Sequence, residues 1–208
     1  MSQNKNLSNI KDIWPKDAPD LDNIPKYIKK YKNELIVIKY GGNVLIERKI
    51  FNNFIDDINI LNQLGLSIVV VHGGGPRIER ELKKEKIKTE FINGLRVTNK
   101  EVITIVEKVL IEFNNDIVNS LNIKGSKAVS LNSKNNNIIK VVPDKPELGY
   151  VGIPQEINTD IIQDIINNKQ IPVVAPLGLN DGNQTYNING DTAASAIAKK
   201  LRSRRLLL

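Results

Sequence analysis

Four short stretches of this sequence carry residue types that could bind and transfer an anionic group. They are Lys39-Tyr40-Gly41-Gly42, Gly73-Gly74-Gly75, Asn93-Gly94-Leu95-Arg96-Val97-Thr98 and Asn187-Ile188-Asn189-Gly190-Asp191. Backbone N–H groups at a glycine turn that opens a helix attract phosphate or carboxylate. Lysine and arginine can neutralise such a group, and asparagine amides can bond its polar neighbours. These residue types together fit an anion-binding site.

The glycine turn at residues 73–75 follows a run of apolar, mostly β-branched residues and precedes Pro76. The run predicts a strand buried on both faces, as in a parallel sheet, and Pro76 suits the first position of a helix. Taken alone, the turn is either an anion cradle or a tight packing turn. Its spacing matches neither a Walker A loop nor the Gly-x-Gly-x-x-Gly dinucleotide fingerprint.

The charged and amide residues each have an ordinary structural alternative. Lys39 ends a predicted strand, at the edge where ligands of open α/β sheets bind, but long basic side chains also snorkel from such positions. Arg96 could hold a carboxylate by two parallel hydrogen bonds, or it could be a surface arginine paired with a glutamate. Asn187 and Asn189 alternate onto one face of a strand, whereas an Asn-rich turn with Asp191 as a helix N-cap is the alternative.

His72 is the only histidine, and the chain has no cysteine. Without a second histidine, a cysteine or an obvious carboxylate cluster, we interpret His72 as a structural residue at a strand end. A metal ligand or a general base is not expected there, and the sequence predicts no metal site made by the protein alone. The lack of cysteine excludes disulfides and is compatible with a reducing cytoplasm.

Alternating strand and helix patterns predict a mostly parallel α/β sheet with right-handed crossovers. The first elements are expected as strands at 34–40 and 68–71 and helices at 50–64 and 76–86. A capping box at 98–101 predicts the start of a long helix. Later elements are expected at 127–131, 138–142 and 150–152 (hairpin strands covering one end of the sheet), 159–167 (helix), 171–176 (buried strand), 184–188 (hairpin strand) and 192–201 (Ala-rich helix, capped by Asp191).

The composition predicts a globular protein with a buried core. The chain has 208 residues, of which 40% are hydrophobic and 25% charged, and a net charge of +7. No apolar run approaches the ~20 residues of a membrane span, and residues 1–13 lack the apolar core of a secretory signal. The basic residues alternate with acidic and amide residues and few aromatics accompany them, which argues against nucleic acid and favours an anionic small molecule. We therefore expect a cytoplasmic protein without nucleic-acid or membrane partners.

The two ends of the chain differ from the middle. Residues 1–33 form an extension that is interrupted by prolines, with 24–31 as its expected helical piece; a solvated arm is the plain interpretation. The last residues, Arg205-Leu206-Leu207-Leu208, resemble the first residues of another buried strand. This pattern leads us to expect a truncated chain.

In their order along the chain, the four stretches resemble those of the N-acetyl-L-glutamate kinases of the amino acid kinase family. The resemblance runs from about Pro25 to Leu208, and residues 93–98 are its most specific part. It implies a three-layer αβα sandwich with a mainly parallel open sheet. It also implies an acetylglutamate-binding N-terminal lobe at 34–201 and the start of an ATP-binding lobe at 202–208.

The reaction that this resemblance implies is transfer of the γ-phosphoryl group of ATP, with Mg²⁺, to the side-chain carboxylate of N-acetyl-L-glutamate in arginine biosynthesis. Such a reaction needs mainly positioning and charge neutralisation, because the carboxylate is already a nucleophile. By resemblance, Lys39 stabilises the transferring group, Asp191 orients Lys39 and a second lysine, and Arg96 holds the α-carboxylate. The further implied residues are Gly41, Gly42, Gly73 and Gly74 for phosphate, and Gly74, Gly75, Asn187 and Asn189 for substrate.

The second lysine and most of the ATP lobe of these kinases would lie beyond Leu208. Two alternatives therefore stay open: a catalytically silent acetylglutamate-binding or assembly module, and a kinase for another acylated amino acid. The extension around 25–28 resembles that of arginine-inhibited, hexameric members. This resemblance implies a homo-oligomer, either a dimer or a hexamer built through the N-terminal arm.

Overall fold

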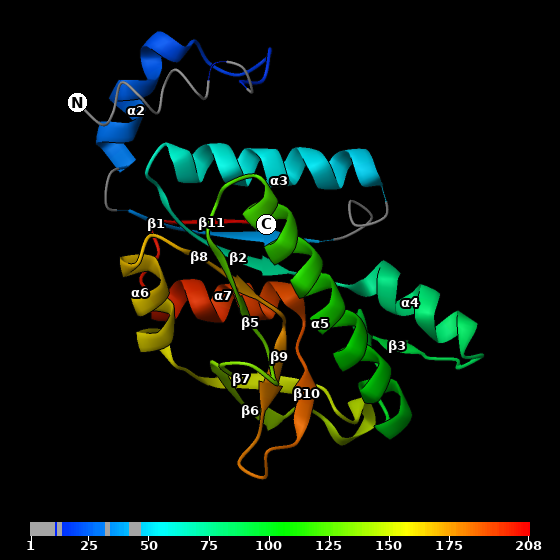
Figure 1. The fold of residues 1–208 in the computed structure, drawn as a ribbon. Helices are drawn as coiled ribbons and strands as arrows, with labels where there is room; N and C mark the ends of the chain where they lie inside the picture. Colours follow the sequence, from blue (N-terminus) through cyan, green and yellow to red (C-terminus); the bar gives the residue numbers. More distant parts are fainter. Residues whose placement is uncertain (1–10, 12–13, 32–33, 42–46) are drawn as a thin grey trace.

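The computed structural model describes residues 11, 14–31, 34–41 and 47–208. Its central sheet consists of β1 (Leu35–Tyr40), β2 (Ser67–His72), β5 (Ala128–Leu131), β8 (Ile171–Val174) and β11 (Arg205–Leu207). The strand order is β11-β1-β2-β8-β5, and all neighbouring strands are parallel (Figure 1). The expected mainly parallel sheet is confirmed.

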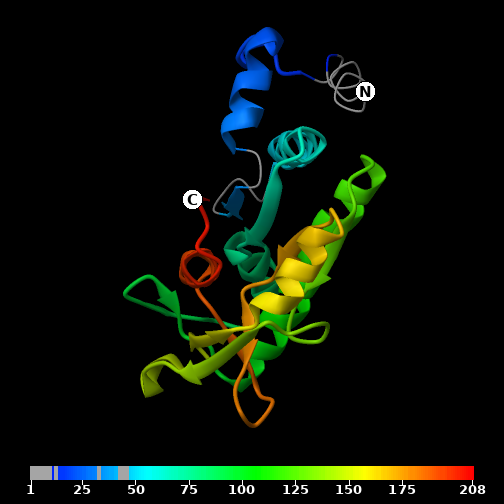
Figure 2. The ribbon, with the colours of Figure 1, turned by 90° about the vertical axis from the view of Figure 1, so that its left-hand side faces the viewer.

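Two helices cover each face of this sheet (Figure 1, Figure 2). They are α3 (Arg48–Gln63) and α5 (Lys100–Ile123) on one face, and α6 (Thr159–Asn167) and α7 (Gly190–Lys200) on the other. Successive strand residues point to opposite faces, so a β-branched strand can pack against both layers. In β2, Val69 and Val71 pack on the α6–α7 side, and Val70 packs on the α3–α5 side. The predicted αβα sandwich is therefore present.

A second, smaller sheet lies beside α7 (Figure 1). It consists of β6 (Ile139–Pro143), β7 (Gly152–Ile157), β9 (Leu177–Leu179) and β10 (Thr185–Asn187). The order is β10-β9-β6-β7, with antiparallel pairing of β6 with β7 and of β9 with β10. The expected hairpin strands at 138–142 and 184–188 are confirmed.

The expected hairpin strand at 127–131 is wrong. This segment is β5, the edge of the central sheet, where Ala128 lies opposite Ile171 in a parallel pair. A strand of four residues has the same local pattern in a hairpin and at a sheet edge. Here the long helix α5 carries the chain back to the central sheet, and β8, reached 40 residues later, supplies the pairing partner.

A short hairpin follows α4 (Gly75–Lys84). It consists of β3 (Phe91–Ile92) and β4 (Leu95–Arg96), joined by Asn93 and Gly94 at φ of 50° and 79°. Positive φ at both central residues is the preference of a tight hairpin turn, and Asn-Gly is its sequence signal. Sequence reasoning did not predict this hairpin, although that signal was present. The hairpin places Phe91 opposite Arg96.

Four helix starts, those of α3, α4, α5 and α7, differ from expectation by one or two residues. Asn99 caps α5 by accepting from the N–H groups of Glu101 and Val102, while the hydroxyl of Thr98 donates to the carbonyl of Arg96. Asn189, not Asp191, caps α7. Helix α4 begins at Gly75, so Pro76 takes its second position. At α5 and α7 neighbouring residues have similar capping ability, and the backbone conformation selects one of them.

The end segments are partly as expected. The helical piece of the extension is α2 (Ile24–Tyr31), and it stands apart from the sandwich (Figure 2). The last strand, β11, pairs with β1, but Leu207 is 50% exposed, so the expectation of a buried strand is wrong. As an edge strand it has a single neighbour in the sheet. Within the described ranges, no helix combines the length and apolar character needed to cross a membrane. The division into lobes at residue 201 stays a prediction.

Candidate functional site

The fold brings residues of all four predicted stretches to one place, and two of these stretches end adjacent strands of the central sheet. Strands β1 and β2 are adjacent and in register at Tyr40 and His72, and the N–H of Gly73 donates to the carbonyl of Tyr40 at 2.7 Å. A cavity of about 210 Å³ opens at this edge. Gly42 lies outside the described residues. The predicted residues that line the cavity are Lys39, Gly73, Gly74, Gly75, Arg96, Asn187, Asn189 and Asp191.

Lys39 forms an ion pair with Asp191, with 2.7 Å between Nζ and Oδ1. The lysine side chain is only 18% exposed, so it does not snorkel into solvent. Instead the side chain lies against two glycines, Gly41 after β1 and Gly190 at the start of α7. A Cβ at Gly41 would lie 2.6 Å from Nζ, and one at Gly190 would lie 3.4 Å from Cε. The lysine therefore crosses between two strand-to-helix connections to reach Asp191.

The cap of α7 explains why Asp191 is available to Lys39. The side-chain oxygen of Asn189 accepts from the N–H groups of Asp191 and Thr192 at 2.9 and 3.0 Å. The carboxylate of Asp191 is therefore not needed as a cap, and it lies in the first turn, where the helix dipole favours negative charge. The Nδ2 group of Asn189 takes no part in the cap, and Asn189 is one of the residues that line the cavity.

The glycine turn at residues 73–75 allows close packing and also leaves backbone N–H groups without an intrahelical acceptor. A Cβ at Gly74 would lie 2.4 Å from Cδ2 of the buried Leu110, whereas one at Gly75 would have open space. The N–H of Gly73, which was expected to face phosphate, is used by Tyr40. The first N–H groups of a helix have no intrahelical acceptor, so the start of α4 at Gly75 supplies the remaining donors.

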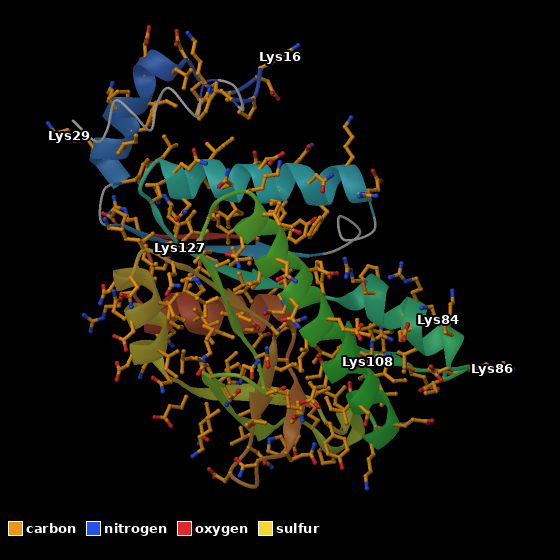
Figure 3. All side chains as sticks on the ribbon, in the orientation of Figure 1. Lys16, Lys29, Lys84, Lys86, Lys108 and Lys127 are labelled. Carbon is orange, nitrogen blue, oxygen red and sulfur yellow. The ribbon has the colours of Figure 1, made fainter. Side chains whose placement is uncertain are left out.

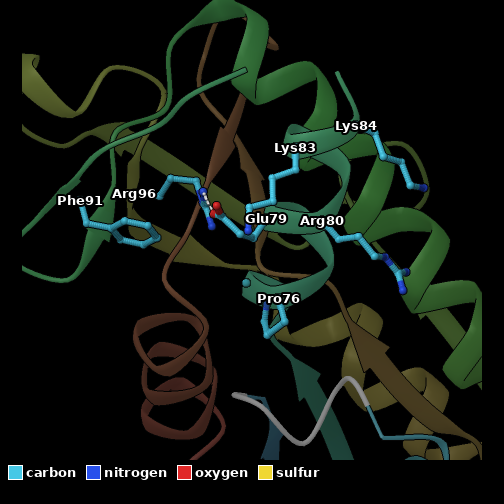
Figure 4. Close-up of a pocket in the computed structure, with 8 residues that line it drawn as sticks. Pro76, Glu79, Arg80, Lys83, Lys84, Phe91 and Arg96 are labelled. Carbon is cyan, nitrogen blue, oxygen red and sulfur yellow. Dashed lines mark hydrogen bonds and ion pairs between the residues drawn. The ribbon is translucent and has the colours of Figure 1, made fainter. Parts of the chain in front are cut away.

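Arg96 is buried and already bound to a carboxylate. Its side chain is 7% exposed, and Nη1 donates to Glu79 Oε2 at 3.0 Å (Figure 4). Nη1 also donates to Thr89 Oγ1 at 2.6 Å. Its guanidinium also lies 4.6 Å from the centre of the Phe91 ring. The alternative of an arginine paired with glutamate is thus half right, because the pair exists but the arginine is not on the surface.

Asn187 and a set of apolar residues complete the wall. The Nδ2 group of Asn187 lies 3.5 Å from the hydroxyl oxygen of Thr98, at the limit of a hydrogen bond. The apolar lining was missed by sequence reasoning, because its members are scattered through the chain and differ in no way from core residues. They are Pro76, Ile78, Phe91, Leu95, Leu110, Val151, Pro176 and Ile188.

His72 lies behind this edge and is fully buried. Asn114 donates through Nδ2 to the carbonyl of Val173 at 3.0 Å and faces Nε2 of His72 at 3.1 Å, which assigns the ring proton to Nδ1, 2.8 Å from the carbonyl oxygen of Gly73. Burial lowers the pKa of His72 to about 4, so the ring is neutral at physiological pH. This environment agrees with a structural role.

A larger and more open hollow of about 820 Å³ adjoins the cavity (Figure 4). The two share Gly75, Pro76, Phe91 and Arg96. The larger hollow is basic, with Arg80, Lys83 and Lys84 on its wall, but it contains neither Lys39 nor Asp191. We therefore assign the predicted chemistry to the smaller cavity.

The surface lysines are distributed over separate parts of the molecule (Figure 3). Lys16 and Lys29 belong to the N-terminal arm, Lys84 and Lys108 flank Glu81, and Lys127 precedes β5. In the part of the chain that the structure describes, no group of three or more histidine, cysteine or acidic side chains could hold a metal ion.

Comparison with known proteins identifies relatives along nearly the whole chain. The sequence model of the amino acid kinase family matches residues 34–208. An acetylglutamate kinase of Pelagibacter ubique is 50% identical over 196 residues, which represent 94% of this chain and 68% of that protein.

Two solved structures share the fold. The protein smu.665 of Streptococcus mutans UA159 is 31% identical, with a TM-score of 0.73 over 84% of this chain and 71% of that chain. An N-acetylglutamate synthase of Neisseria gonorrhoeae, complexed with coenzyme A and N-acetyl-glutamate, is 23% identical, with a TM-score of 0.78 over 89% of this chain and 43% of its own. At that identity the second likeness supports the fold alone.

Proposed function

We propose that this chain, which belongs to the amino acid kinase family, transfers the γ-phosphoryl group of ATP to the side-chain carboxylate of N-acetyl-L-glutamate. The product is an acyl phosphate, and the step belongs to arginine biosynthesis. The relative of 50% identity carries the name of this activity. The chain spans about two thirds of that relative.

The observation that carries the proposal is the Lys39–Asp191 pair beside the start of α4. A carboxylate with an ordinary pKa is ionised at neutral pH and needs no general base to attack phosphorus. The protein has to hold the substrate carboxylate next to the γ-phosphate and neutralise the negative charge on the oxygens of the transferring phosphoryl group. Lys39 does this with its ammonium group, Asp191 holds Nζ in place, and Gly74 and Gly75, at the start of α4, line the same cavity.

Arg96 and the asparagines bind the rest of the substrate. The guanidinium pairs with the α-carboxylate, and the amides of Asn187 and Asn189 bond its neighbouring polar groups. The apolar wall near Val151 and Ile188 accommodates the methyl group and methylenes of an acylated amino acid. A substrate whose reacting carboxylate meets the phosphoryl group beside Lys39, and whose α-carboxylate pairs with Arg96, spans both charged ends of the cavity.

ATP and Mg²⁺ are the cosubstrate and metal that a kinase of this kind requires. Mg²⁺ is commonly held by nucleotide phosphates and waters with few protein carboxylates, which is compatible with the described residues, where no cluster of metal ligands is found. When bound, the ion neutralises the oxygens of the β- and γ-phosphates. The residues of this chain that meet the γ-phosphate in our proposal are Lys39, Gly74 and Gly75.

Trapping of the acyl phosphate tests the proposal. The purified chain is incubated with ATP, Mg²⁺, acetylglutamate and hydroxylamine, and hydroxamate is measured. We expect hydroxamate that depends on ATP and on acetylglutamate. Binding of acetylglutamate without hydroxamate would favour the silent module, and faster reaction with another acylated amino acid would favour a kinase for that substrate.

We also propose that the chain forms a homo-oligomer in the cytoplasm, a dimer or a hexamer assembled through the arm. Helix α2 stands away from the sandwich (Figure 2), and its Tyr27 is 50% exposed. Light scattering after size-exclusion chromatography, with the chain and its Tyr27→Ser variant, gives the mass. A hexamer that falls to dimers in the variant supports the role of the arm, and a monomeric chain contradicts the proposal.

A further inference from the structure

The substrate-binding arginine is not vacant in this structure. Arg96 donates through Nη1 to Glu79, a residue of α4, and to Thr89, which precedes β3. Its side chain is 7% exposed, while that of Glu79 is 48% exposed. The cation is thus fixed in the wall, and the carboxylate is the movable partner of the pair.

Glu79 approaches Arg96 from outside the catalytic cavity. Arg96 lines both hollows, whereas Glu79 lines only the larger, outer one. In Figure 4 the carboxylate of Glu79 points to Arg96 from α4, and Phe91 covers another side of the guanidinium. A carboxylate that enters the inner cavity would therefore meet an arginine that already has a negative partner.

A second carboxylate at the Arg96 guanidinium would be repelled by that of Glu79, because like charges a few ångströms apart disfavour each other. We propose that Glu79 is a positioning residue that occupies Arg96 while the cavity is empty and that the α-carboxylate of the substrate displaces it. This inference rests on the proposed function, since it takes acetylglutamate as the ligand of Arg96. Glu79 then acts on specificity, because a ligand without an α-carboxylate cannot take its place.

The displaced carboxylate has a partner on its own helix. Lys83 follows Glu79 by four residues, a spacing that brings side chains together on a helix surface, and Arg80 lies on the same hollow. In the described part of the chain neither Arg80 nor Lys83 takes part in an ion pair. Glu79 can thus move from Arg96 to Lys83 by rotation of its side chain, with no change in the backbone.

Calorimetric titration of the whole chain with acetylglutamate tests this exchange without requiring turnover. Glu79→Gln keeps the shape of the side chain but removes the competing charge, so we expect the affinity to rise about two- to fivefold, the range of a partly exposed ion pair. Glu85→Gln, at the end of the same helix and without contact to Arg96, is the matched control and should leave the affinity unchanged. Lys83→Gln should lower the affinity in the wild-type background and not in the Glu79→Gln background.

A second ligand separates displacement from a general effect of charge. 4-Acetamidobutyrate has the acetamido group and the reacting carboxylate but no α-carboxylate. Its affinity should be the same for the wild-type chain and for Glu79→Gln. Equal affinity of both chains for acetylglutamate, or an equal gain for both ligands, would overturn the inference while leaving the proposed function intact. Failure of acetylglutamate to bind either chain would overturn the proposed function and the inference with it.

Discussion

The two charged ends of the cavity are built in different ways. At one end Lys39 pairs with Asp191, and both residues sit where a central strand or a capped helix fixes the backbone. At the other end Arg96 belongs to a two-stranded hairpin and pairs with a half-exposed glutamate from a neighbouring helix. The first pair is positioned for chemistry before the substrate arrives. In our proposal the second pair opens when the substrate binds, so that the first pair serves turnover and the second serves recognition.

The largest effect is expected at the fixed end. Lys39→Met removes the ammonium group beside the transferring phosphoryl, and we expect kcat to fall about 10²- to 10³-fold, as for the loss of one preorganised donor. The KM for acetylglutamate should change little, because Arg96 is untouched. Lys199→Met, in the last turn of α7, is the matched control and should keep the wild-type rate in the hydroxamate assay. A raised KM for acetylglutamate with unchanged kcat in Lys39→Met would contradict the different roles of the two ends.

The stability of the folded chain should also be sensitive to acid, through the buried His72. Its pKa is lowered to about 4 in the folded chain by burial, against about 6.5 when unfolded. Between pH 6.5 and pH 4 the His72 ring is therefore protonated in the unfolded chain and neutral in the folded chain. The folded state loses stability as the pH falls through this range, by an amount on the order of 3 kcal/mol.

Proton NMR of the single histidine checks this directly, since no other imidazole is present. The ring signals of the folded chain should stay constant from pH 8 to pH 5. Urea unfolding over the same range should show the midpoint falling with pH. A titration with a midpoint near 6.5 would contradict the buried, neutral ring.

At the exchangeable end, Arg96→Lys should weaken acetylglutamate binding about 10- to 100-fold, because lysine cannot make two parallel hydrogen bonds and a charged hydrogen bond is lost. The kcat at saturating substrate should fall much less. Calorimetry and the hydroxamate assay together give the two quantities. Unchanged affinity would remove Arg96 from the site.

The smallest effect is on the turn between the two ends. Gly74→Ala would place its Cβ 2.4 Å from Leu110, so the core must shift, and we expect a loss of stability of about 1–3 kcal/mol. Gly75→Ala is the neighbouring control, because its Cβ enters open space. Its stability should stay within about 0.5 kcal/mol of wild type in urea unfolding. Similar losses in both variants would indicate that the turn is limited by backbone conformation and not by packing.

Much of the fold was predictable from local patterns. The helix limits at 24–31 and 159–167 agree with α2 and α6, and the β-branched run before the glycines is the buried strand β2. Such segments are decided by burial and by backbone preference, which the local sequence encodes. The strand at 127–131 was predicted as well, but its place at the edge of the central sheet was not, because its pairing partner comes from a distant segment.

By itself, the sequence determined the strand-turn-helix unit at 68–77 and the residue types that reach the cavity, because apolar periodicity and glycine restrict the backbone locally. Only the tertiary structure decided which charged groups meet. Asp191 can pair with Lys39 because Asn189 caps α7. Glu79 pairs with Arg96 because α4 packs beside the β3–β4 hairpin. Ion pairs between separate elements depend on how those elements pack, and no local pattern carries that information.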